Sequence, residues 1–364
     1  KLTDIQVEAG SKYGYTPEKT LELIQSLYEK HKLISYPRTG GRYVSTEKSK
    51  DFARLLKAVE AMPGLTDIAK AITPDAIKSA QANKRFVNDA EVQKSSHDAL
   101  IPTGETSAIN NLTGDEMNIC EMIFKRFLAI FMPPLEEEKT KAVLSDNGIK
   151  FSCTGSKVLK PGFTVLFSNP KEAPLPNMAA GQKLKEKEKS LHEIVSKPPA
   201  RFTQATLLEA MENVQKYMAA DETELKNAMK KAGGIGQPSS RAAIIAELVS
   251  TGYMEDVKSG RGKGLHITES GKRYIENLGT SSIVSPELSA QWEVYMNDIR
   301  EGNMTYDEVY EKVIEYVYQS LKELEGMHIQ KVASGNRKEV GKCPKCGKPV
   351  VALSKGYGCS GYPD

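Results

Sequence analysis

Apolar residues recur every three or four positions through most of the first third of the chain, and this spacing predicts helices. We expect two helices within residues 3–32, with further helices at 46–61, 66–71 and 114–131. Thr16-Pro17-Glu18 should open the second helix, because a hydroxyl cap followed by proline is a typical helix start. Its apolar positions should face a core: Leu21, Leu23, Ile24 and Leu27. Residues 62–64 and 73–75 are expected as loops.

The pattern changes to alternation between residues 139 and 188, which predicts strands. The alternating apolar positions fall in three groups: 142–144, 149–153 and 163–167. Asp146-Asn147-Gly148 and Pro161-Gly162 supply turn residues between these groups. The Lys/Glu run at 183–189 is interpreted as a solvated ribbon.

A third pattern begins after the proline-containing stretch 197–203, which we interpret as a domain boundary. Helices starting at Thr203 and covering 242–251 are followed by two expected strands, a flexible basic loop at 258–264 and a helix from Thr268. This order describes a winged helix, a module that binds nucleic acid in some proteins and other proteins elsewhere. Helices at 286–299 and 305–324 close the region, the latter with these core positions: Tyr306, Val309, Val313, Ile314 and Val317.

Composition bounds the class of protein without deciding its function. The 364 residues suffice for two or three domains, and 39% hydrophobic with 27% charged residues is ordinary for a soluble protein. No apolar run approaches the length of a membrane span. A net charge of +3 does not by itself indicate a nucleic-acid partner. The chain begins without methionine and stops inside a cysteine-rich motif, so we expect a piece of a longer protein.

Tyr36 lies in the most informative stretch, Leu33 to Ser45. Pro37 stops a helix there and favours an extended conformation for Tyr36. Arg38 and Arg42 follow, so a phenol nucleophile is close in sequence to guanidinium groups that can hold phosphate oxygens. This pattern indicates covalent attack on a phosphodiester. The alternative is that Tyr36 packs under a loop and Arg38 is an ordinary surface residue.

His97 lies in the second informative stretch, residues 94–104. A lone histidine is more often structural than functional, but an imidazolium here could donate a hydrogen bond to a phosphate oxygen. Asp98 could fix its tautomer or simply face solvent.

A glycine-rich loop, 233–241, enters a helix and offers backbone N–H groups that suit a phosphate. We expect further contacts to a DNA backbone from these residues: Gly236, Ser239, Ser240 and Arg241, with Arg261 and Lys263 in the wing. The glycines could also form only a turn.

The end of the chain carries Cys343, Cys346 and Cys359. The Cys-x-x-Cys spacing is a strong half-site for zinc, which structural sites bind with four ligands. Zinc could bind weakly here, with water or His328 completing the site, but we expect disorder. Cys120 and Cys153 are interpreted as core residues, and five cysteines in this arrangement indicate a reducing cytoplasm and not a disulfide framework.

Tyr36-Pro37-Arg38-Thr39 followed by Arg42-Tyr43 resembles the active-site stretch of type IA DNA topoisomerases, particularly the topoisomerase III branch. Two further stretches resemble family motifs in the same order: His97-Asp98-Ala99 with Pro102-Thr103, and Gly234-Ile235-Gly236 with Arg241. Departures are Gln237, Ser240, and Gly40-Gly41, where the family usually has Asp-Ser.

The resemblance implies an α+β, mostly helical, multidomain topoisomerase core. Its expected parts are a helical domain with the tyrosine (1–122), a β-rich arch or gate domain (123–198), a winged-helix-like DNA-binding domain (199–330), and a linker with an incomplete zinc ribbon (331–364).

The resemblance also implies an activity. Tyr36 would cut one DNA strand and hold its 5′ end as a phosphotyrosine, with Arg38 and His97 beside the scissile phosphate, to relax negative supercoils or decatenate DNA. The family's Mg²⁺ ligands, a glutamate and an Asp-x-Asp pair, belong to an N-terminal toprim domain, and no Asp-x-Asp occurs in this sequence. We therefore expect a cytoplasmic monomer that binds single-stranded DNA but is inactive without that domain.

Two other classes of protein would also account for parts of the sequence. A relaxase needs a His-x-His metal site, which the sequence lacks, and tyrosine recombinases place their tyrosine near the C-terminus. The other rival is a non-catalytic winged-helix and zinc-ribbon protein that binds nucleic acid. It accounts for residues 200–364 but leaves the tyrosine and histidine stretches without a purpose.

Overall fold

The computed structural model describes residues 1–168, 170–185, 188, 190, 192–259, 262–279, 281–325, 339–353 and 356–359. The chain divides into two compact units. The first contains Lys1–Ile5 and Glu22–Pro199, and the second contains Gln6–Leu21 and the part of the chain from Ala200 onward. Among the described residues, none of the helices combines the length and apolar composition that crossing a bilayer requires.

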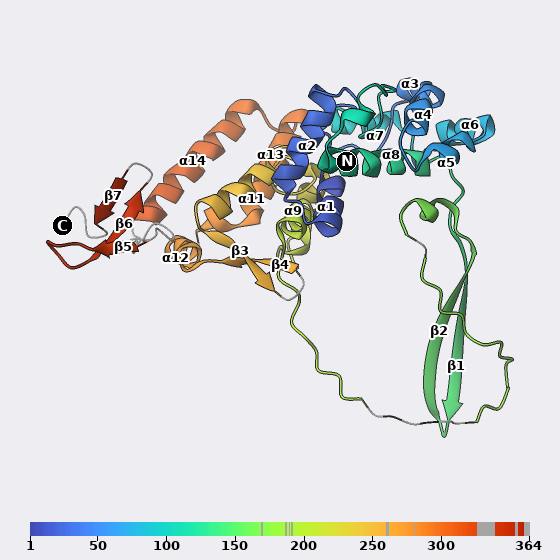
Figure 1. The fold of residues 1–364 in the computed structure, drawn as a ribbon. Coiled ribbons are helices and arrows are strands. Elements are labelled where there is room, and N and C mark those ends of the chain that lie inside the picture. Colours follow the sequence, from blue (N-terminus) through green and yellow to red (C-terminus); the bar gives the residue numbers. More distant parts are fainter. Residues whose placement is uncertain are drawn as a thin grey trace. The chain divides into compact units, whose positions relative to one another are not determined.

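Helices dominate the first unit (Figure 1). Their bounds are α1 (Leu2–Tyr13) and α2 (Pro17–Glu29), which both units share, then α3 (Thr46–Ser49), α4 (Phe52–Glu60), α5 (Thr66–Lys70), α6 (Pro74–Ala82), α7 (Asp89–Ser95), η1 (Ile109–Asn111) and α8 (Gly114–Ala129). Thr16 caps α2 as predicted, accepting a hydrogen bond from the backbone of Lys19. Ile24 and Leu27 are fully buried, whereas Leu21 and Leu23 are half-buried.

Two predictions for residues 46–82 are wrong. The single helix expected at 46–61 is broken at Lys50 and Asp51 into α3 and α4. The loop expected at 73–75 is a helix start, because the Thr73 hydroxyl accepts a hydrogen bond from Ala76 N and Pro74 occupies the first turn of α6. The core of this unit contains an edge-to-face cluster of Phe52, Phe127 and Phe131, with ring centroids 5.1–5.6 Å apart.

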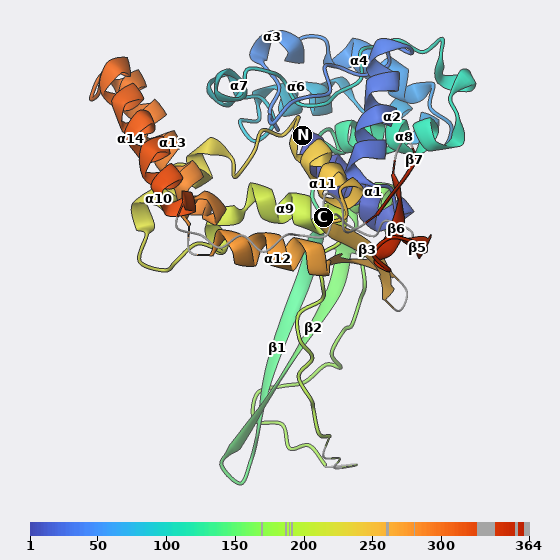
Figure 2. The ribbon, with the colours of Figure 1, turned by 90° about the vertical axis from the view of Figure 1, so that its left-hand side faces the viewer.

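A long antiparallel hairpin, β1 (Glu136–Asp146) and β2 (Ile149–Lys160), is visible in both ribbon views (Figures 1 and 2). Asn147 and Gly148 have φ angles of 47° and 82°, as a two-residue Asn-Gly turn requires, so this prediction is confirmed. The strand expected at 163–167 is wrong: this segment is the short 3-10 helix η2 (Gly162–Leu166). There the Phe163 amide donates to the Pro133 carbonyl and no strand partner is present among the described residues.

The second unit contains α9 (Gln204–Glu212), η3 (Val214–Lys216), α10 (Thr223–Ala232), α11 (Arg241–Ser250), β3 (Met254–Ser259), β4 (Gly262–Ile267), α12 (Glu269–Leu278), η4 (Ser282–Val284), α13 (Pro286–Glu301) and α14 (Tyr306–Glu325). Thr203 and Thr268 cap α9 and α12. The sequence did not predict α10. The β3–β4 ladder continues to Ser259 and Gly262, so most of the expected loop 258–264 is strand. Arg261 lies outside the described residues.

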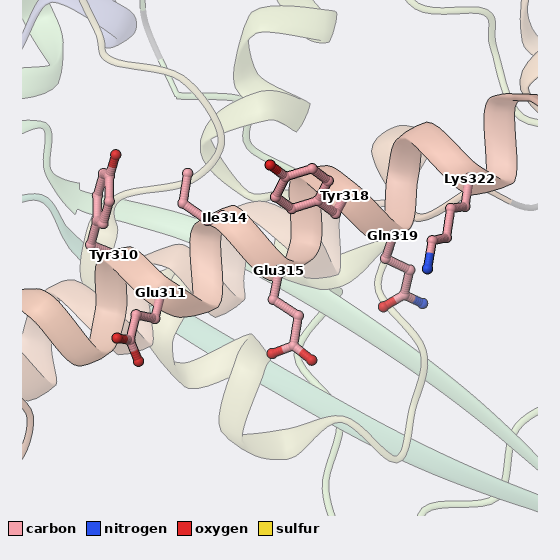
Figure 3. A pocket seen from close by; sticks show the side chains of 7 residues that line it. All are labelled: Tyr310, Glu311, Ile314, Glu315, Tyr318, Gln319 and Lys322. Atoms are coloured by element: carbon pink, nitrogen blue, oxygen red, sulfur yellow. The ribbon is translucent and has the colours of Figure 1, made fainter.

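The core predicted for α14 is mostly exposed. Val309 is buried, but Tyr306, Ile314 and Val317 are 67%, 38% and 45% exposed. The buried stripe runs instead through Val309, the half-buried Val313 and Tyr316, and Ser320, because α14 packs on α13 through Tyr316, whose ring centroid is 5.4 Å from that of Trp292. Figure 3 shows the exposed side, where these side chains line an open hollow: Tyr310, Glu311, Ile314, Glu315, Tyr318, Gln319 and Lys322.

Candidate active site

The stretch that carries Tyr36 pairs with the stretch that carries His97. After α2 the chain turns through Lys32, with φ of 56°, and runs extended. Ser35 N donates to Ile101 O at 2.9 Å, and Thr103 N donates to Leu33 O at 3.0 Å. These bonds form a short antiparallel bridge. Two motifs about sixty residues apart in sequence are therefore side by side in one unit.

A second set of backbone contacts fixes the residues around His97. Ala99 N donates to Tyr43 O at 2.8 Å. Asp98 Oδ1 accepts a hydrogen bond from Ser45 N. Asp98 therefore anchors the chain that follows Arg42 and does not simply face solvent. Its effect on the tautomer of His97 stays a prediction.

The rings of Tyr36 and His97 are adjacent. Their centroids are 4.7 Å apart, with an angle of 49° between the planes. Tyr28, near the end of α2, packs edge-on against Tyr36 with a centroid distance of 5.7 Å. Tyr36 is nevertheless 40% exposed, so its phenol is accessible, unlike that of a tyrosine packed under a loop. The sequence did not predict that Tyr28 packs against Tyr36. The one sequence signal for Tyr28 is that it directly follows the core residue Leu27 on the same helix.

The two arginines near Tyr36 differ in their surroundings. Arg38 is exposed. Arg42 donates two hydrogen bonds to the Asp4 carboxylate, at 3.0 and 2.9 Å. Its hydrogen bonding with Asp4 raises the pKa of Arg42 further above its ordinary value. Arg42 would have to share or leave this partner to contact DNA.

A buried polar cluster, not predicted from the sequence, joins the end of α2 to the start of α8. Glu116 Oε1 accepts hydrogen bonds from Ser26 Oγ at 2.6 Å and His31 Nε2 at 3.2 Å, and Oε2 accepts from Thr113. Burial raises the pKa of Glu116, but the hydrogen bonds from Ser26, Thr113 and His31 together outweigh it and lower the pKa to about 2. The cluster therefore fixes the end of α2, after which the Tyr36 stretch begins.

The glycine-rich loop belongs to the second unit. Gly233, Gly234 and Gly236 have φ angles of 81°, 94° and 71°, which favour glycine. Arg241 is 1% exposed, and its guanidinium donates to the carbonyls of Ile235 and Gly233. Burial lowers its pKa. The donors of Arg241 thus hold the loop together, and a phosphate contact by Arg241 stays a prediction that requires the side chain to leave those carbonyls.

For the other residues of this unit, contact with DNA stays a prediction. Ser240 Oγ donates to Gln237 O at 3.1 Å. Gly236 and Ser239 lie in the turn before α11. The backbone of Lys263 is part of β4.

The three C-terminal cysteines lie together on a small sheet of β5 (Glu339–Lys342), β6 (Pro349–Leu353) and β7 (Gly356–Cys359). The expectation of disorder is therefore wrong for this described part. The metal-binding atoms of Cys343, Cys346 and Cys359 are within 4.8 Å of one another. Hydrogen bonds from the backbone of Cys346 and Lys345 lower the pKa of Cys343 to about 7. This donor set fits zinc with one position left for a fourth ligand. His328 lies outside the described residues.

Comparisons with known proteins agree on one family. The model of a family described as DNA topoisomerase matches residues 1–311. DNA topoisomerase 3 of Bacillus licheniformis is 34% identical over 97% of this chain and 48% of its own length, and DNA topoisomerase 3 of Bacillus subtilis is 30% identical over the same shares. The chain thus spans about half the length of these relatives.

A solved structure has a similar fold. Full-length topoisomerase I from Thermotoga maritima covers 98% of this chain with a TM-score of 0.60, and this chain covers 54% of it. The sequence identity is 24%. The family-model match over residues 1–311 and the similarity to the curated relatives, taken with the paired tyrosine and histidine stretches, show that the chain belongs to the type IA DNA topoisomerases, a family of isomerases.

Proposed function

We propose that the chain supplies the nucleophile half of a type IA topoisomerase. Tyr36 Oη attacks a phosphorus atom of single-stranded DNA. A bond forms between these two atoms, and the bond from phosphorus to the 3′ oxygen breaks. The phenol proton leaves, the released 3′ oxygen gains a proton, and the 5′ end is held as a phosphotyrosine. The reverse attack rejoins the strand after strand passage, which relaxes negative supercoils or decatenates DNA.

The observation that carries this proposal is the exposed Tyr36 phenol next to the His97 imidazole, on two paired segments. In its protonated form His97 would donate a hydrogen bond to a non-bridging phosphate oxygen, and the exposed Arg38 would neutralise charge on the same group. Membership of the family supports the same roles.

The part of the chain that the structure describes contains no group of ligands that fits the Mg²⁺ of the family. The one metal-type cluster there is the three thiols, and Mg²⁺ prefers oxygen ligands. We place the Mg²⁺ ligands in the half of the relatives' length that this chain does not span. Alone, the chain is expected to bind single-stranded DNA as a cytoplasmic monomer without relaxing supercoils.

Further assignments belong to the same proposal. Residues 1–122, 123–198 and 199–330 would be the tyrosine, arch and winged-helix-like domains, followed by a zinc-binding end. A part in DNA binding is assigned to Arg42, Asp98, Gly236, Ser239, Ser240, Arg241, Arg261 and Lys263, with Asp98 acting through the backbone it holds at Ser45.

Trapping of a covalent adduct tests the proposal. Single-stranded oligonucleotides labelled at the 5′ or the 3′ end are incubated with the chain, with or without the separately made remaining half of a relative, and then denatured. We expect an adduct on the 5′-phosphate side only when both halves are present, and none with Tyr36→Phe. Arg38→Ala should slow its formation by about 100-fold or more, as loss of a charge-stabilising donor does.

The contradicting result is no adduct under either condition while tight binding of the oligonucleotide is retained. That result would favour the non-catalytic nucleic-acid-binding rival, in which Arg38→Ala costs only one phosphate contact, about 1–3 kcal/mol of binding free energy.

A further inference from the structure

Gly41 is buried in a place where a side chain does not fit. A Cβ atom built on it would lie 2.6 Å from the backbone oxygen of His97 and 2.6 Å from Ser95 Oγ. Packed carbon and oxygen atoms do not approach this closely, and a backbone oxygen cannot rotate away as the end of a side chain can. Any residue other than glycine would therefore displace the main chain at His97.

The loop that carries the His97 carbonyl is held on both sides of His97. Ser95, the last residue of α7, donates its hydroxyl to His97 O at 2.8 Å. Ser96 between them is left-handed, with φ of 61°. Ala99 N is bonded to Tyr43 O on the other side of His97. The loop is thus fixed at both ends of His97.

The opposite side of the contact is equally fixed. Gly41 N donates to Thr39 Oγ1 at 2.9 Å, and the fully buried Thr39 accepts a backbone hydrogen bond from Leu2 N at 3.0 Å. The main chain at 39–41 is therefore fixed, and the loop 95–97 is the part that would move if a side chain were added at Gly41.

We propose that Gly41 is a positioning residue. Because Gly41 has no side chain, the loop 95–97 packs directly against the backbone that follows Tyr36. This contact holds the His97 ring 4.7 Å from the Tyr36 ring. The serine usual in the family at this position would push the His97 carbonyl away in this chain. The geometric part of this proposal is that Gly41 sets the position of the His97 ring, and it depends only on these contacts. The catalytic part is that this position speeds the reaction, and it rests on the proposed roles of Tyr36 and His97.

Histidine proton NMR on the full chain tests the geometric part. The rings of neighbouring aromatic residues shift the His97 imidazole protons from their free-histidine positions, and the His97 signals are assigned by their loss in His97→Gln. Tyr36→Leu gives the reference for a lost contact. We expect Gly41→Ala to move the signals at least about half of the way to that reference. Gly114→Ala is the matched control, because no atom lies within 4 Å of its added Cβ.

A second variant keeps the test decisive if Gly41→Ala does not fold. Ser95→Ala introduces no clash and removes the hydroxyl that holds the His97 carbonyl, so the His97 signals should move in the same direction by a smaller amount. Signals that stay in place in every folded variant of this pair overturn the proposal.

Adduct formation with the remaining half of a relative tests the catalytic part. Gly41→Ala should slow the adduct by about 10- to 100-fold, as displacements near 1 Å do, and Gly114→Ala should leave the rate unchanged. A displaced His97 with an unchanged adduct rate would overturn the positioning role. If the unaltered chain forms no adduct, the proposed function fails, and the NMR result alone decides whether Gly41 seats the loop.

Discussion

At the scale of single residues, Arg241 was expected to contact DNA, but its buried side chain stabilises its own loop. Its guanidinium donates to the carbonyls of Gly233 and Ile235 and so holds the loop that precedes α11. Arg241→Met should therefore lower the free energy of unfolding of the second unit by about 1.5–3 kcal/mol, the typical contribution of hydrogen bonds that involve a charged group. Thermal unfolding followed by circular dichroism measures this change.

The salt dependence of single-stranded DNA binding separates the two roles of Arg241. If Arg241 only orders the loop, it releases no counterions on binding, and the slope of log K against log salt is the same in Arg241→Met as in the unaltered chain. A slope reduced by about 0.7 would instead identify a direct phosphate contact. Lys231→Met, at an exposed lysine near the end of α10, controls for the loss of one positive charge.

At the scale of elements, the Glu116 cluster makes the stability of the contact between α2 and α8 depend on pH. The folded-state pKa of Glu116 is about 2, below its ordinary 4.5. Its contribution to stability is therefore present above about pH 4.5 and is lost as the pH falls through 2. The full shift corresponds to about 3.4 kcal/mol at most. Urea unfolding of the chain and of Glu116→Gln should show a stability difference that narrows between pH 5 and 2.

A difference between Glu116→Gln and the unaltered chain that does not change with pH would contradict this account. Other carboxylates titrate in the same range, but they are present in both proteins and cancel. Glu121→Gln, which removes an ion pair with Lys125 near the middle of α8, is a control of the same kind on the same helix.

The three-cysteine end should bind a thiophilic metal more tightly as the pH rises. Thiolates are the metal-binding form, and the pKa of Cys343 is lowered to about 7, so its proton is displaced most easily. Titration with Co²⁺ should produce thiolate charge-transfer absorption that strengthens between pH 6 and 8 and weakens in Cys359→Ser. Equal absorption in both proteins would show that the three thiols do not share one ion.

Some elements could be predicted because a local signal decides them. Thr203 before α9 and Asn147-Gly148 between β1 and β2 each carry a side chain or a backbone preference that acts within four residues. The pairing of Tyr36 and His97 in one site could be expected only from the resemblance to a family, because no local pattern relates residues 60 positions apart.

Other features could not be predicted because distant contacts decide them. On α14 two apolar stripes compete, and packing on α13 selects the one that contains Tyr316. Arg241 looks like a surface cation in the sequence, but the carbonyls of its own loop bury it. The steric role of Gly41 depends on where the His97 carbonyl lies, which the spacing of the motifs does not give.

At the scale of the whole molecule, the division into units does not follow the order of the sequence. Residues 6–21 precede the Tyr36 stretch, yet they belong to the second unit. Val7 packs on its core cluster of Leu208, Ala242 and Ile245. A Cβ added to Gly10 would lie 2.6 Å from the Ala205 Cβ. The N-terminal helix is therefore required for the packing of a unit whose other residues begin at Ala200.

Gly10→Val should consequently destabilise the second unit, although the substitution lies in the first helix of the chain. The added side chain has to separate α1 from α9, at a cost of about 1–3 kcal/mol, typical of overpacking. The single tryptophan, Trp292, lies on α13 in this unit, so its fluorescence reports the unfolding of this unit in urea. We expect its transition to move to lower urea in Gly10→Val and to stay in place in Gly114→Ala. An unchanged Trp292 transition in Gly10→Val would mean that residues 6–21 do not stabilise the second unit.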